Sequence, residues 1–129
     1  MPSAIEISGL NKSYGHIQAL RELNLSVHWG NVVSVFGPNG SGKTTLIKVL
    51  STLARPDSGI VRIAGLDPRK YHKEIHKRIG VMTHDTFLYS QLTVLENLQF
   101  YGRMFGVKNL SSRISSVCQI FRLTSYLDF

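Results

Sequence analysis

One short segment of the chain carries residues that could bind phosphate. Residues 37–44 read Gly-Pro-Asn-Gly-Ser-Gly-Lys-Thr, which satisfies the phosphate-loop pattern G-x-x-x-x-G-K-[ST]. The glycines let the backbone take positive φ angles and approach a ligand closely, so that successive N–H groups point into one concavity that favours an anion. Lys43 adds a full positive charge that can reach the β- and γ-phosphates of a nucleotide.

Two hydroxyl groups follow this lysine. Thr44 stands where the pattern places a hydroxyl for a Mg2+ ion that bridges the phosphates. Thr45 can donate one more hydrogen bond to the α-phosphate. The segment therefore predicts a site for a magnesium-bound nucleoside triphosphate.

The residues on either side decide between phosphate binding and a plain turn. Residues 32–36 are nearly all apolar and rich in valine, which is typical of a strand buried on both faces. Residues 43–53 place leucine, isoleucine and valine at helical spacing. A glycine-rich turn that merely joins a strand to a helix is the alternative, but strand, loop and helix in this order favour phosphate binding.

The remaining pattern predicts an α/β fold with a small β appendage. Asp67-Pro68 marks the start of a helix, and Thr93 with Glu96 has the spacing of a capping box. We expect strands at 4–10, 18–27, 32–36, 60–63 and 79–83, and helices at 43–53, 67–78, 93–105 and 111–122.

Composition narrows the function classes without choosing among them. The 129 residues are 43% hydrophobic and 18% charged, which is typical of a globular protein. A single cysteine, Cys118, rules out an internal disulfide framework and fits a reducing compartment. No apolar run is long enough to span a membrane, and no secretory signal is evident at the start. The net charge of +7 suits anionic partners: nucleotides, nucleic acid or a membrane surface.

The phosphate segment and its surroundings resemble ABC-type ATPases. Pro38, Asn39 and the Thr44-Thr45 pair make residues 37–46 similar to the Walker A loop of that family. Four further segments also resemble the family. Residues 10–15 resemble its adenine-stacking loop, and residues 56–65 resemble the turn and strand after its first helix. Residues 78–82 resemble the strand that enters the Q-loop, and residues 92–98 resemble the start of the helical subdomain. The resemblance covers residues 4–123.

This resemblance implies a fold and a set of binding residues. The fold is a P-loop NTPase of the ABC ATPase type, with an incomplete parallel core sheet, a small antiparallel β-subdomain and the start of the helical subdomain. ATP and Mg2+ are the implied cofactors. Tyr14 is implied to stack on adenine, although a tyrosine in a turn can also pack on the core. The implied nucleotide-binding residues are Tyr14, Gly37, Pro38, Asn39, Gly40, Ser41, Gly42, Lys43, Thr44 and Thr45.

The Q-loop departs from the family pattern. The family places a glutamine that contacts Mg2+ after the strand, whereas this chain has His84 followed by Asp85. The pair resembles the branch that contains haem-exporter ATP-binding subunits of cytochrome c maturation. His84 and Asp85 are therefore candidate metal ligands, with loop residues that contact no ligand as the alternative.

Other parts of the family pattern are not found. The signature loop, the Walker B strand and the switch histidine are missing from residues 1–129, which we expect to form the N-terminal portion of a nucleotide-binding domain. Phosphoryl transfer depends on placing Mg2+ and a water, so we expect this chain to bind nucleotide weakly and to hydrolyse none. We also expect it to be marginally stable or prone to aggregation on its own, because sheet edges would be exposed.

The resemblance implies a role in transport. The complete protein would be a cytoplasmic ATP-binding subunit, peripheral on the inner face of the membrane. It would form a homodimer or heterodimer and drive a transmembrane subunit. Alternatives are a soluble ABC ATPase that acts on nucleic acid or the ribosome through the basic residues 69–78, or a nucleotide-binding remnant. Nucleic acid is not favoured as a partner, because Tyr71 is the only aromatic residue among these basic residues that could stack on a base.

Overall fold

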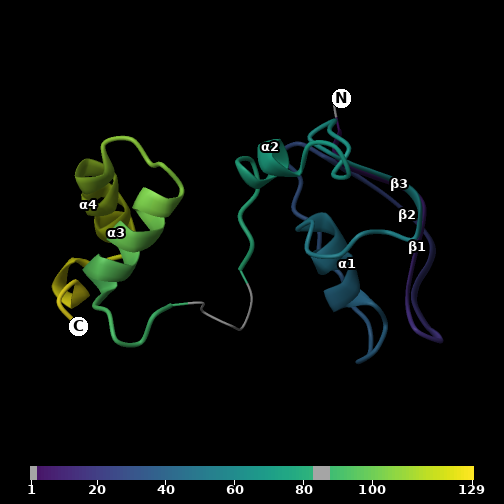
Figure 1. Cartoon of the computed structure of the whole chain (residues 1–129), viewed down its shortest axis with the longest axis horizontal. Helices are drawn as coiled ribbons and strands as arrows, with labels where there is room; N and C mark the ends of the chain where they lie inside the picture. Colours follow the sequence, from purple (N-terminus) through teal and green to yellow (C-terminus); the bar gives the residue numbers. More distant parts are fainter. Residues whose placement is uncertain (1–2, 83–87) are drawn as a thin grey trace. The chain divides into compact units, whose positions relative to one another are not determined.

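The chain folds into two compact units. The structure, a computed structural model, describes residues 3–82 and 88–129 (Figure 1). The first unit extends to Val81, and the second begins at Met82. Each unit has its own packed residues, and the two are treated separately below.

The first unit is built on a three-stranded antiparallel sheet. Its strands are β1 (Ser3–Tyr14), β2 (Ile17–His28) and β3 (Ser58–Ile63), in the spatial order β2-β1-β3. In the central strand, Ile7 pairs with Leu25 on one side and with Val61 on the other. This sheet confirms the small antiparallel subdomain, and all three strands are longer than the sequence predicts.

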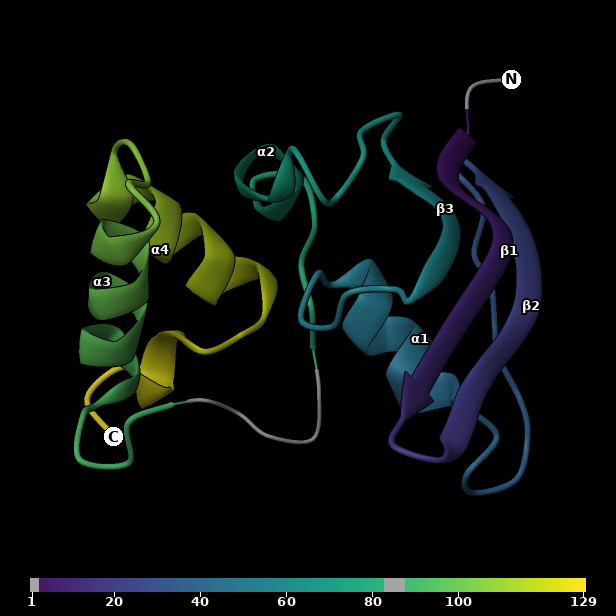
Figure 2. The same ribbon diagram turned by 45° about the vertical axis from the view of Figure 1, so that its right-hand side comes forward.

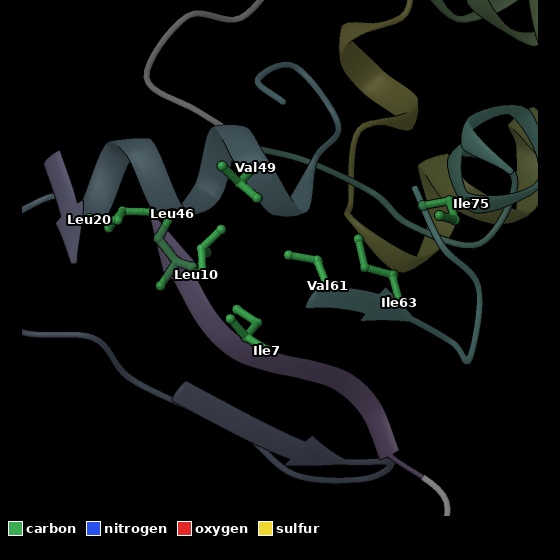
Figure 3. Close-up of a cluster of buried hydrophobic side chains, with 8 residues drawn as sticks. All are labelled: Ile7, Leu10, Leu20, Leu46, Val49, Val61, Ile63 and Ile75. Carbon is green, nitrogen blue, oxygen red and sulfur yellow. The ribbon is translucent and has the colours of Figure 1, made fainter. Parts of the chain in front are cut away.

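A helix packs on this sheet and closes the core. Figure 2 shows α1 (Lys43–Leu50) lying against the curved strands. Leu46 and Val49 are three residues apart and therefore share one helix face, which is buried toward the sheet (Figure 3). The core cluster consists of Ile7, Leu10, Leu20, Leu46, Val49, Val61, Ile63 and Ile75.

The helices of the first unit are shorter than predicted. α1 ends at Leu50 rather than Leu53, and the amide of Ser51 makes the last bond that spans four residues, to the carbonyl of Ile47. The helix predicted from Asp67 is limited to α2 (His72–His76). Asp67 instead forms a turn, because its side chain accepts from the amide of Arg69.

Two strands predicted for a parallel core sheet are not strands in the described structure. Residues 32–36 and 79–82 lack regular secondary structure, and Val32 and Phe36 are 95% and 89% exposed. A strand needs hydrogen-bonded neighbours, and neither segment pairs with a described strand. Residues 32–36 are thus apolar but exposed, whereas such apolar segments are usually buried.

The second unit is helical. Its elements are α3 (Val94–Met104), α4 (Leu110–Ile120) and the 3-10 turn η1 (Thr124–Tyr126). The capping box at the start of α3 is confirmed: the Thr93 hydroxyl accepts from the amide of Glu96, and the Glu96 carboxylate accepts from the amide of Thr93. Gly102 lets α3 approach Leu110 closely, since a Cβ at this glycine would collide with the Leu110 side chain.

Other expectations for the chain concern its cysteine and membrane segments. Cys118 is a free thiol and is fully buried, so it packs in the second unit as a small apolar side chain. Among residues 3–82 and 88–129, no helix combines the length and the apolar character that crossing a bilayer requires.

The core predicts which side chains stabilise the first unit. Leu10 is fully buried, so Leu10→Ala should lower the free energy of unfolding of this unit by about 2–5 kcal/mol. Hydrogen exchange of the β1 amides measures this loss. Leu53→Ala is the control, because Leu53 is 74% exposed and its removal should change the free energy by less than about 0.5 kcal/mol. Similar effects for both variants would contradict the core assignment.

Candidate functional site

The predicted phosphate loop is folded back on itself rather than extended. The amide of Ser41 donates to the carbonyl of Pro38 at 3.2 Å, which closes a turn. Gly40 and Gly42 have φ angles of 84° and 91°, in the region that favours glycine. These residues, with Gly37 and Asn39, form the bend that leads into α1.

Gly42 fixes the bend against the sheet. It is the left-handed residue at which α1 begins, and its carbonyl accepts from the amide of Leu46 at 2.8 Å. A Cβ at this position would overlap the carbonyl oxygen of Ala19 and lie 2.8 Å from Leu20 Cδ2. The start of α1 is therefore held close to β2, and only glycine fits there.

The first turn of α1 presents unpaired amides. The first bond along the helix is donated by Leu46, so the amides of Lys43, Thr44 and Thr45 have no partner within the helix. No side chain caps this end, and its first turn holds no acidic residue. Free amides and the positive end of the helix dipole make this a favourable place for an anion.

The ammonium of Lys43 lies inside the loop. Its Nζ donates to the carbonyl oxygens of Gly37 and Pro38, both at 2.7 Å, and lies 3.4 Å from Ser41 Oγ. These partners are neutral, and none of the described carboxylates forms an ion pair with Lys43. Its charge therefore stays available to an anion that enters the loop.

The two threonines occupy different environments. Thr44 is exposed and Thr45 is half-buried, both in the first turn of α1. The Thr44 hydroxyl is therefore accessible to a cation bound beside the loop. This turn suits a magnesium-bound phosphate, because hydroxyl oxygen is a ligand that Mg2+ accepts and because the amides at the start of α1 are free.

Tyr14 lies at the end of β1, next to the β1–β2 turn. Figures 1 and 2 both place this hairpin at the same end of the first unit as the loop before α1. The close approach of Gly42 to Ala19, near the start of β2, agrees with that placement. Tyr14 is 48% exposed, so it is not packed into the core.

Asp57 is a residue of this region that sequence reasoning did not select. Its carboxylate forms an ion pair with Lys12 Nζ at 2.7 Å and accepts from the amide of Ser13 at 2.7 Å. The Lys12 hydrogen bond, followed by the Ser13 amide, holds the pKa of Asp57 below its ordinary value of 3.8. Asp57 was placed only in a turn, because its partners lie far away in the sequence.

The Q-loop candidates are not placed. His84 and Asp85 lie outside the described residues, so their assignment as metal ligands stays a prediction. Within the part of the chain that the structure describes, no group of three or more His, Cys, Asp or Glu side chains could hold a metal ion.

Several known proteins are similar to this chain in sequence. A family model described as "ABC transporter" matches residues 20–128. The ABC transporter ATP-binding protein NatA of Bacillus subtilis is 34% identical over 115 residues, which cover 87% of this chain and 47% of NatA. The daunorubicin resistance ATP-binding protein DrrA3 of Streptomyces coeruleorubidus is 38% identical over 123 residues, which cover 94% of this chain and 39% of DrrA3. The chain thus spans less than half the length of these relatives.

Solved structures show the same fold. An ATP-binding subunit of an ABC transporter superimposes with a TM-score of 0.83 and 25% identity, over 97% of this chain and 53% of that one. CbiO1 of Clostridium perfringens, part of the ABC transporter complex CbiONQ, gives a TM-score of 0.84 at 22% identity, over 99% of this chain and 54% of CbiO1. The described backbone thus follows the fold of an ABC ATPase subunit.

The close contact at Gly42 leads to a prediction. Gly42→Ala should destabilise the first unit more than Gly40→Ala, which is a matched control with a φ angle of 84° and open space around the missing Cβ. Both variants carry a backbone cost of about 1–2 kcal/mol. Gly42→Ala adds about 1–3 kcal/mol because the Ala19 carbonyl and the Leu20 side chain must move. Urea unfolding measures the difference, and equal midpoints would show that α1 is not held against β2 in this way.

Proposed function

Because the chain belongs to the ABC transporter ATP-binding family, we propose that residues 37–45 bind the phosphates of MgATP. The observation that carries this proposal is the first turn of α1, whose amides are free while the Lys43 ammonium lies within the loop. The backbone amides donate directional hydrogen bonds to the phosphate oxygens, and the lysine ammonium neutralises their negative charge.

Lys43 changes partners when nucleotide binds. Before binding, the carbonyls of Gly37 and Pro38 satisfy its ammonium. Phosphate oxygens carry negative charge, so their hydrogen bonds to an ammonium are stronger than those of neutral carbonyls. The lysine therefore turns from its own loop to the ligand, and the loop needs no large rearrangement.

Thr44 is the residue that would hold Mg2+ beside the phosphates, through its exposed hydroxyl. The ion, when bound, neutralises phosphate charge. His84 and Asp85 are further candidate ligands for it. Tyr14 contributes separately. It is 48% exposed and ends β1, at the hairpin that lies at the same end of the first unit as the loop before α1, so its ring can stack on adenine.

For the whole protein, we propose that ATP hydrolysis drives transport across a membrane. The relatives support this, since they are named as an ABC transporter ATP-binding protein and a daunorubicin resistance ATP-binding protein. The subunit would lie on the cytoplasmic face of the membrane, pair with a second ATP-binding subunit and contact a transmembrane subunit. The haem-exporter branch stays a prediction, as does the absence of hydrolysis by residues 1–129 alone.

The second unit offers a surface for the transmembrane partner. On α3, Phe100 and Tyr101 form ring contacts with Tyr89, and Tyr101 stacks with Phe105. Phe100 is 42% exposed and Phe105 is 73% exposed, so this aromatic row remains accessible in the second unit. Exposed aromatic groups are enriched at protein interfaces, which favours a contact role over a cofactor site.

Nucleic acid binding is the weaker alternative. The basic side chains of residues 69–78 are exposed around α2, and Tyr71 is the aromatic residue among them. The relatives named above are transporter or drug-resistance proteins. A salt-dependent affinity for nucleic acid would be the sign of this alternative.

Phosphate binding is tested by removing the Lys43 ammonium. Lys43→Ala should lower the affinity for a fluorescent ATP analogue with Mg2+ at least tenfold, since a charged hydrogen bond contributes about 1.5–3 kcal/mol. Lys48→Ala is the matched control, because Lys48 is an exposed lysine in the last turn of the same helix. Unchanged affinity in Lys43→Ala would remove the assignment of the phosphate loop.

Adenine stacking is tested at Tyr14. Tyr14→Phe should keep the affinity for ATP, because it keeps an aromatic face. Tyr14→Ala should lose about 1–3 kcal/mol of binding free energy. Isothermal titration with MgATP measures both variants, and an equal loss in Phe and Ala would indicate that the hydroxyl rather than the ring is used.

A further inference from the structure

One residue, Asp57, holds the segment before Tyr14 from the start of the neighbouring strand β3. Asp57 precedes β3, and its amide donates to the carbonyl of Asn11 at 3.0 Å. Its two carboxylate oxygens bind the next two residues of β1. Oδ1 accepts a hydrogen bond from the Lys12 ammonium and Oδ2 accepts one from the Ser13 amide, each at 2.7 Å. Asp57 therefore fixes three successive residues immediately before Tyr14.

Lys12 connects this contact to the tyrosine ring. Its Nζ lies over the ring of Tyr14, 5.4 Å from the centroid. The Lys12 side chain is only 15% exposed, and the ion pair with Asp57 sets where its ammonium lies. One face of the ring is thus occupied by a cation, which leaves the opposite face for a planar ligand.

A carboxylate suits this position for two reasons. It accepts from the Ser13 amide and the Lys12 ammonium at the same time, which a side chain with one oxygen could not do with equal geometry. The same contacts favour its ionised form, since they lower the pKa of Asp57. The contact is therefore fully formed at neutral pH.

We propose that Asp57 is a positioning residue for the nucleotide base: through Ser13 and Lys12 it orients the ring of Tyr14 before adenine stacks on the face opposite Lys12. This inference rests on the proposed role of Tyr14 in binding adenine. A side chain ordered in advance loses less conformational freedom when a ligand binds. Asp57 therefore increases the binding free energy that adenine contributes and leaves the contribution of the phosphates unchanged.

The test compares a ligand that has a base with one that has none. Asp57→Ala should weaken MgATP binding about two- to twelvefold, the cost of ordering one side chain on binding. Its affinity for inorganic tripolyphosphate with Mg2+ should equal that of the unmodified chain. Asp57→Asn keeps an acceptor for Ser13 but loses the ion pair, so its loss should be smaller. Asp67→Ala is the matched control, because Asp67 also accepts from a backbone amide in a turn of the first unit.

A double-mutant cycle tests whether Asp57 acts through Tyr14. In the Tyr14→Ala background, Asp57→Ala should no longer change the affinity for MgATP, because there is no ring to orient. An undiminished effect in that background would overturn the proposal, as would equal losses for MgATP and tripolyphosphate. If Tyr14→Ala alone leaves MgATP affinity unchanged, the stacking role of Tyr14 is wrong and the inference falls with it. Loss of tripolyphosphate binding in Lys43→Ala but not in Asp57→Ala would separate the two parts of the site.

Discussion

The free amides at the start of α1 are the feature on which the site depends. A helix cannot satisfy the first N–H groups of its own backbone, so these groups need a partner from elsewhere. Here no side chain caps them, and Gly42 holds them against β2 at a distance that a Cβ would prevent. The sheet and the core behind α1 keep this end of the helix in place, so the antiparallel subdomain supports the proposed phosphate site directly.

In the proposed site, different groups recognise the phosphates and the base. The loop uses backbone groups and one ammonium, which suits any triphosphate. The proposed base site uses side chains at the end of β1, where Lys12 lies over the ring of Tyr14 and Asp57 holds Lys12. Both parts rest on β1 and β2, because one end of this pair carries Tyr14 and the start of β2 meets Gly42. The core cluster therefore fixes the spacing between the two parts of the site.

Local patterns allowed correct prediction of local features. The glycine-rich loop, the helix after it, the strand at 60–63 and the capping box of Thr93 and Glu96 are all set by near neighbours in the sequence. The strands expected at 32–36 and 79–83 were not found in the described residues, because apolar character predicts burial but cannot supply the neighbouring strands that burial requires. Asp57 escaped prediction for a similar reason, since it meets Lys12 and Ser13 only after β1 and β3 have paired.

Amide signals offer the most direct view of the central claim. In 1H–15N spectra of the chain titrated with MgATP, the account predicts that the largest shifts occur at residues 40–45 and that exchange of these amides with solvent becomes slower. Tripolyphosphate with Mg2+ should reproduce these changes while leaving the region around Tyr14 unaffected. Saturable shifts confined to other parts of the chain, with residues 40–45 unchanged, would contradict the account.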